Sequence, residues 1–74
     1  MKAIIYTVVE NSELVSTTLE YKADDATDGS IAYLFKTLCK IIRDQNIEIV
    51  FSSSTRITYK MEGVFTCSYD LIDI

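Results

Sequence analysis

This 74-residue chain contains no histidine, no proline and no tryptophan. Histidine is the commonest general base and the commonest metal ligand, so its absence excludes Ser-His-Asp and Cys-His catalysis. Glycine occurs twice. The one glycine near a helix start, in Thr27-Asp28-Gly29-Ser30, only superficially resembles a phosphate loop, because its aspartate would repel a phosphate. We therefore expect a protein that is not an enzyme and that holds neither a cofactor nor a metal.

Cysteine is also scarce. The two cysteines, Cys39 and Cys67, do not form a Cys-x-x-Cys motif. Both lie in apolar stretches, and apolar surroundings raise the pKa of a thiol and reduce its reactivity. We expect two reduced thiols that pack as small apolar groups, since a disulfide would need an oxidising compartment.

No apolar run approaches the roughly 20 residues that a membrane-spanning helix needs. The first residues, MKAIIYTVVENSE, alternate as a strand does and lack the small-residue cleavage site of a signal peptide. These features predict a cytoplasmic protein that does not associate with a membrane.

The composition is that of one compact domain covering residues 1–74. Hydrophobic residues make up 49% of the chain, a globular rather than a disordered proportion. Seven basic residues stand against eleven acidic ones, which gives a formal charge of −4. An acidic chain is poorly suited to binding nucleic acid through its phosphates, whereas it suits a basic protein partner.

The segment 27–46 has the spacing of an amphipathic helix. Thr27 or Asp28 can cap its start, and Asn46 suits the left-handed position that follows a helix. The predicted apolar stripe comprises Ile31, Leu34, Phe35, Leu38, Ile41 and Ile42.

Alternating patterns on both sides of this helix predict five strands. Residues 2–9 and 14–21 form a hairpin around Asn11-Ser12, and this register places Val8 opposite Val15. Turns at 52–54 and 61–63 connect the other three strands, with Gly63 in a left-handed conformation. The expected aromatic core comprises Tyr6, Phe35, Phe51, Tyr59, Phe65 and Tyr69.

The predicted fold is an α+β domain of order ββαβββ, in which one helix packs on the apolar face of one antiparallel sheet. The expected strand order is 2-1-3-4-5. A β-grasp arrangement, in which the first and last strands are parallel, is the alternative. Residues 70–74 either extend the last strand or form an arm that docks on another subunit. The hydroxyl-rich segment 52–55 is expected to be an exposed hairpin tip.

Four acidic residues gather before the helix, and they are the first choice for a partner-binding site: Glu20, Asp24, Asp25 and Asp28. Their simplest role is to solvate a turn and oppose the helix dipole. A weak calcium site is a second interpretation, although the regular spacing of a calcium loop is missing. In the third, these charges meet the basic surface of a partner, and binding then weakens as salt rises.

An apolar patch on the outer face of the sheet is the alternative partner-binding site. It comprises Ile5, Val9, Leu14 and Val50. These side chains form an exposed patch only if they cluster on adjacent strands. In that case Val50→Glu is the substitution expected to impair binding.

Three classes of function remain, and a small non-catalytic protein-binding module ranks first. Its expected partner is another protein, and a host nucleic-acid-binding protein is one candidate. The composition is rich in Ile, Thr, Asp and Tyr, as in products of AT-rich genes. This favours a phage or mobile-element accessory protein that inhibits a host machine by occupying a basic surface. A structural subunit that assembles as a homodimer or larger homo-oligomer ranks second, and an enzyme ranks last because the catalytic groups are missing.

Overall fold

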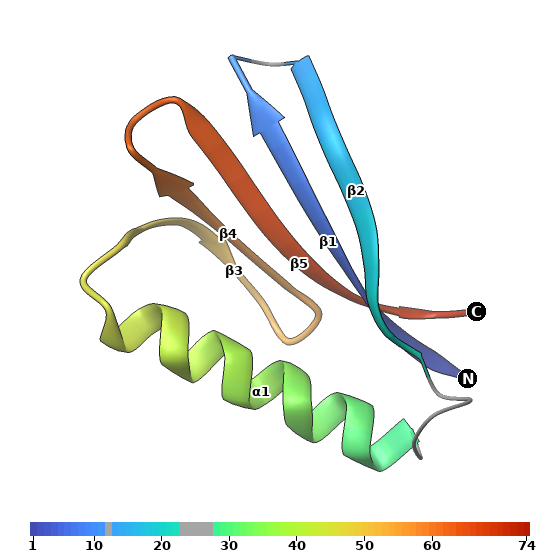
Figure 1. The fold of residues 1–74 in the computed structure, drawn as a ribbon. Coiled ribbons are helices and arrows are strands. Elements are labelled where there is room, and N and C mark those ends of the chain that lie inside the picture. Colours follow the sequence, from blue (N-terminus) through green and yellow to red (C-terminus); the bar gives the residue numbers. More distant parts are fainter. Residues whose placement is uncertain (12, 23–27) are drawn as a thin grey trace.

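The computed structural model describes residues 1–11, 13–22 and 28–74. These residues form one five-stranded antiparallel sheet and one helix (Figure 1). The elements are β1 (Lys2–Glu10), β2 (Glu13–Lys22), α1 (Asp28–Asp44), β3 (Glu48–Ser52), β4 (Arg56–Met61) and β5 (Phe65–Asp73). The predicted α+β class and the ββαβββ order are confirmed.

The predicted strand order is wrong. The observed order is β2-β1-β5-β4-β3, so β5 rather than β3 lies beside β1. β1 and β5 are antiparallel from the pair of Lys2 and Asp73 to the pair of Glu10 and Phe65, which also rules out the β-grasp alternative. Both of these strands have nine residues, whereas β3 has five. The nine-residue β5 pairs with β1 along its whole length, which the five-residue β3 could not do.

The C-terminal segment extends β5 and does not form an arm. Residues 70–73 continue the pairing with β1, and the Ile74 N–H donates to the Met1 carbonyl oxygen at 3.0 Å. The Lys2 ammonium lies 2.8 Å from the Asp73 carboxylate and lowers the pKa of that carboxyl. The two ends of the chain are therefore joined in one strand pair.

α1 packs on the apolar face of the sheet, as the helical spacing predicts. The buried side of the helix carries Ile31, Phe35, Cys39 and Ile42, which meet Ile4, Ile57, Tyr59 and Cys67 of the sheet. Leu34 and Leu38 are partly buried against this core. Ile41 is exposed, so its place in the predicted stripe is wrong, and Cys39 fills the centre of the stripe instead. Asn46 has a φ of 56°, the left-handed conformation predicted for it.

Bulges alter the register of two strand pairs. Val8 lies opposite Ser16 rather than the predicted Val15, because β2 contains an extra residue at this point. β3 has a similar irregularity at Val50, after which Phe51 lies opposite Thr58. Phe51 is 52% exposed, so its predicted place in the core is wrong. Alternation did not reveal these insertions, because consecutive residues at each one are apolar and do not show which residue is inserted.

The turn between β4 and β5 comprises Glu62, Gly63 and Val64, one residue later than predicted. Met61 lies opposite Phe65 across it, and Gly63 has a φ of 75°, as expected for this position. The shift preserves the faces, so Tyr59, Cys67 and Tyr69 still share the inner side of the sheet.

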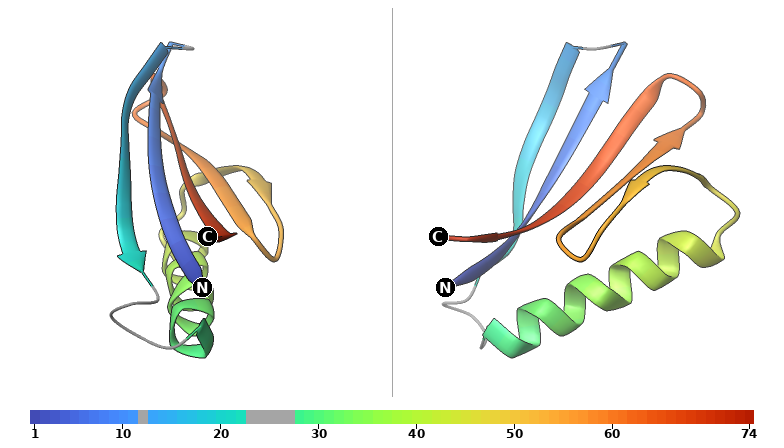
Figure 2. Two further views of the ribbon diagram at one scale, coloured as in Figure 1. Left: turned by 90° about the vertical axis from the view of Figure 1, so that its right-hand side faces the viewer. Right: turned by 180° about the vertical axis from the view of Figure 1, so that it is seen from behind.

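The helix covers one end of the sheet and leaves the other end open. The turns of the β1–β2 and β4–β5 hairpins both lie at the end that rises away from α1 (Figure 2). Within the described part of the chain, no helix is long and apolar enough to span a membrane.

Candidate protein-binding surface

The two hairpin turns meet at the open end of the sheet. The Asn11 N–H donates to the Val64 carbonyl oxygen at 3.3 Å, which connects turns more than 50 residues apart in sequence. One row of paired residues crosses four strands here: Glu13, Glu10, Phe65 and Met61. Residues from both halves of the chain therefore form a single surface.

A shallow hollow of about 280 Å³ lies on the inner side of this row. It is lined by Tyr6, Val8, Met61, Glu62, Phe65 and Cys67. We call the hollow, together with Glu10, Glu13 and Val64, the hairpin-end surface. Met61 is 42% exposed and Val64 43%. Aromatic and methionine side chains in a partly exposed concave site are the residue types that concentrate binding energy at protein interfaces.

The floor of the hollow, formed by Tyr6 and Cys67, belongs to a neutral cluster that also contains Tyr59 and Tyr69. The Tyr6 and Tyr69 rings have centroids 4.6 Å apart. Burial raises the pKa of Tyr6, and its hydrogen bonds with Cys67 and Tyr59 raise the pKa further. Burial also raises the pKa of Tyr59. Both phenols stay protonated at neutral pH, so the floor is suited to contact rather than to proton transfer.

The rim of the hollow is acidic, because Glu62 lines it and the paired residues Glu10 and Glu13 continue the row that begins at Met61 and Phe65. Glu10 and Glu13 lie directly opposite each other at the end of the β1–β2 hairpin, and Glu62 follows Met61 in the neighbouring turn. All three are exposed. Like charges that directly face each other across a strand pair destabilise it. A cationic group brought to this rim would remove that repulsion.

The predicted acidic site is only partly within the described chain. Glu20 belongs to β2 and Asp28 begins α1, whereas Asp24 and Asp25 lie outside the described residues. The role of these four residues in partner binding remains a prediction.

The predicted outer-face patch is divided. Val9 and Leu14 are direct partners across β1 and β2, and Ile5 lies further along β1. Val50 lies in β3, from which β1 is separated by β4 and β5. The corrected strand order therefore places Val50 apart from the other three residues, and their role in binding is likewise still a prediction.

The two cysteines lie inside the core. Cys39 and Cys67 are buried free thiols. Burial raises the pKa of Cys39, and the nearby Arg43 lowers it to a smaller extent. Among the residues described, no group of three cysteines or carboxylates could hold a metal ion.

No protein-family model, curated protein or solved structure matches this chain.

The sequence does not predict the hairpin-end surface, because the residues that form it lie far apart along the chain. Glu10 and Glu13 flank the predicted Asn11-Ser12 turn, and this close pair was a usable local signal. Met61 and Glu62 fell in a predicted turn, where exposed residues are ordinary. Their proximity to Glu10 follows from the pairing of β1 with β5, which the predicted strand order did not contain.

Proposed function

We propose that this chain is a non-catalytic module that binds another protein through the hairpin-end surface. The observation that supports this most strongly is the apolar hollow between two hairpins, lined by aromatic and methionine side chains and bordered by Glu10, Glu13 and Glu62. An apolar centre with a charged rim is the usual anatomy of a specific protein interface.

The chemistry of this surface defines its partner. The hollow takes an apolar side chain, and the glutamate rim takes lysine or arginine residues beside it. The formal charge of −4 adds long-range attraction to a basic protein and speeds encounter. A basic, nucleic-acid-binding surface of a host protein meets this description, and occupying it would inhibit the host machine. This is the role of a phage or mobile-element accessory protein.

A homo-oligomeric assembly subunit is the second candidate, and the position of β2 favours it. This ten-residue strand lies at one edge of the sheet, where a second copy could add a strand. Two irregularities in its pairing with β1 argue against such addition, since bulges twist an edge away from partners. Two copies joined at the hairpin-end surface would also bring glutamates together.

The test is affinity capture with the immobilised chain from a lysate of its native cells, after the native mass has been measured. We expect a monomer that retains a basic protein, and we expect retention to decrease as salt rises through the range where charges are screened. A stable dimer that captures no protein would instead favour the assembly function.

Replacing Glu13 by Gln separates binding from stability. The substitution removes the repulsion between Glu10 and Glu13, so the free energy of unfolding should rise by a few tenths of a kcal/mol. Partner association should slow several-fold, because rim charges act mainly on the association rate. Thermal unfolding and surface-plasmon kinetics measure the two effects. An unchanged association rate would show that the glutamates of the rim do not take part in binding.

Reversing both Asp24 and Asp25 to lysine tests the acidic segment before α1. If this segment meets the partner, binding should weaken and lose much of its salt dependence, while the thermal midpoint stays nearly constant. The same kinetic assay measures this. Binding equal to that of the native chain would show that these carboxylates only solvate a turn.

A further inference from the structure

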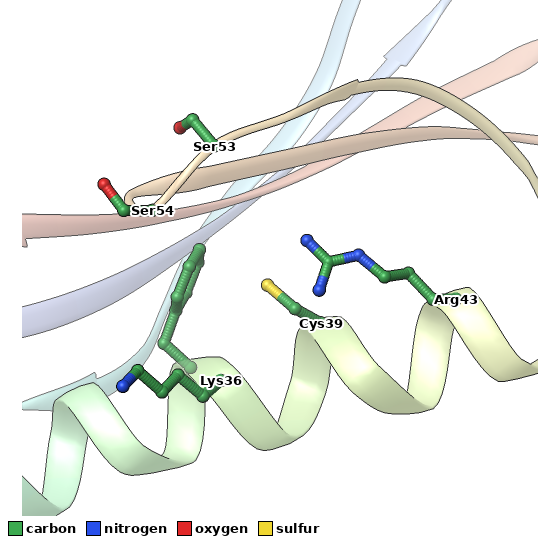
Figure 3. A pocket seen from close by; sticks show the side chains of 6 residues that line it. Lys36, Cys39, Arg43, Ser53 and Ser54 are labelled. Atoms are coloured by element: carbon green, nitrogen blue, oxygen red, sulfur yellow. The ribbon is translucent and has the colours of Figure 1, made fainter.

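A second concave site lies between α1 and the β3–β4 turn, on a different part of the molecule from the hairpin-end surface. Its volume is about 450 Å³, within the range of about 300–1,000 Å³ usual for small-ligand sites. The helix contributes Phe35, Lys36, Cys39 and Arg43, and the turn contributes Ser53 and Ser54. Figure 3 shows Cys39 and Arg43 in the space between the helix and the turn that carries the two serines, and Lys36 extending along the helix.

The residues that line the cleft carry charged as well as neutral hydrogen-bond donors. Lys36 and Arg43 supply cationic N–H groups, and they lie toward opposite ends of the cleft in Figure 3. Arg43 donates from Nη2 to the Ser52 hydroxyl oxygen, which holds its guanidinium across the cleft. A guanidinium has five N–H donors, so the others are available to a ligand.

The two serines lie on the opposite wall, and their hydroxyl groups point away from the helix in Figure 3. The Ser53 oxygen accepts from the backbone N–H groups of Thr55 and Arg56, at 3.2 and 3.1 Å. With its oxygen occupied in this way, the hydroxyl hydrogen of Ser53 is left to donate. Among the described residues, no group is hydrogen-bonded to the Ser54 hydroxyl or paired with the Lys36 ammonium.

Among the described residues, no carboxylate lines this cleft, although acidic residues outnumber basic ones in the chain. Its floor is apolar, since Phe35 and Cys39 are buried. Charge-assisted hydrogen bonds strengthen beside such a low-dielectric floor. An ion with acceptors on all sides fits this set of donors, whereas a cation finds no ligand in it.

We propose that this cleft binds the phosphoryl group of a small phosphorylated anion. Arg43 supplies planar N–H donors to two phosphate oxygens, and Lys36 supplies a point charge at the other end. The separation of the two cations favours a ligand with two anionic groups, such as a diphosphate, over a single phosphate.

Titration of the ¹⁵N-labelled chain with inorganic pyrophosphate, followed by NMR at constant ionic strength, tests the proposal. We expect saturable shifts at the Arg43 side-chain N–H and the Ser53 and Ser54 amides, with pyrophosphate binding more tightly than inorganic phosphate. Arg43→Gln should weaken binding about tenfold or more, the effect of losing a charge-assisted hydrogen bond. Lys36→Gln should weaken it to a similar degree.

Lys40→Gln is the matched control. Lys40 is an exposed cation on the same helix but does not line the cleft. Its replacement changes the net charge by the same amount as Arg43→Gln or Lys36→Gln. This variant should therefore bind pyrophosphate within about twofold of the native chain. Amide spectra of each variant without ligand establish that the fold is retained. Absence of saturable shifts at millimolar pyrophosphate would overturn the proposal. Equal losses in the Arg43→Gln and Lys40→Gln variants would also overturn it, because they would indicate general charge attraction.

Discussion

Replacing Phe35 by alanine is expected to lower the free energy of unfolding by about 3–5 kcal/mol. Phe35 is 2% exposed and lies in the centre of the cluster that joins α1 to the sheet. Its loss removes the largest buried side chain of the helix and leaves a cavity that a small domain cannot close. The free energy of unfolding of a whole domain is usually about 5–15 kcal/mol, so this substitution removes much of the stability. Chemical denaturation followed by circular dichroism measures the effect.

Tyr33→Ala is the control for this substitution. Tyr33 is 73% exposed on the same helix, so truncating it should change stability by no more than about 0.5 kcal/mol. Equal effects of the two substitutions would contradict the packing of α1 on the sheet. Leu38, which is partly buried at the side of the same cluster, should give an intermediate loss when replaced by alanine.

Replacing Met61 by lysine is expected to weaken partner binding by about a hundredfold, the effect of losing an interface hot spot. Met61 lines the apolar hollow and is accessible. A lysine there puts a charge where the partner's apolar side chain must pack, and it opposes the basic residues that meet the glutamate rim. Because Met61 lies outside the buried core, the fold should persist. Isothermal titration with the captured partner measures the affinity.

Val50→Lys is the matched variant for Met61→Lys. Val50 is 52% exposed and lies on the edge strand β3, and the substitution makes the same change in net charge. We expect partner affinity to decrease only by the small factor due to net charge. The opposite result, in which Val50→Lys abolishes binding and Met61→Lys does not, would place the partner on β3 and favour the outer-face patch.

The sequence predicted the local elements of this fold well. Helical spacing located α1 and the burial of Phe35, and alternation located the strands. Left-handed conformations were correctly assigned to Asn46 and Gly63, since few residues adopt them readily. These features depend on interactions between residues close in the chain, so a short window contains the information.

The wrong predictions concern places where segments far apart in the sequence lie side by side. Whether β3 or β5 lies beside β1 depends on the relative lengths of the strands and on backbone pairing across the whole chain. A one-residue bulge shifts a period-two pattern, but the consecutive apolar residues around Val15 and Val50 hide that shift. Predicting the hairpin-end surface requires both the strand order and the register of the strand pairs. The cleft depends on the approach of the β3–β4 turn to α1, so its serines were assigned only to a hairpin tip.

Backbone amide shifts of the ¹⁵N-labelled chain, recorded on addition of the purified partner, test the central claim most directly. The proposed interface predicts the largest shifts at residues 8–11 and 61–67, which form the hairpin-end surface and its turns. The exposed helix face around Tyr33 should show no comparable change. Shifts confined to α1 or to β3, with the two hairpin turns unaffected, would contradict the proposed surface.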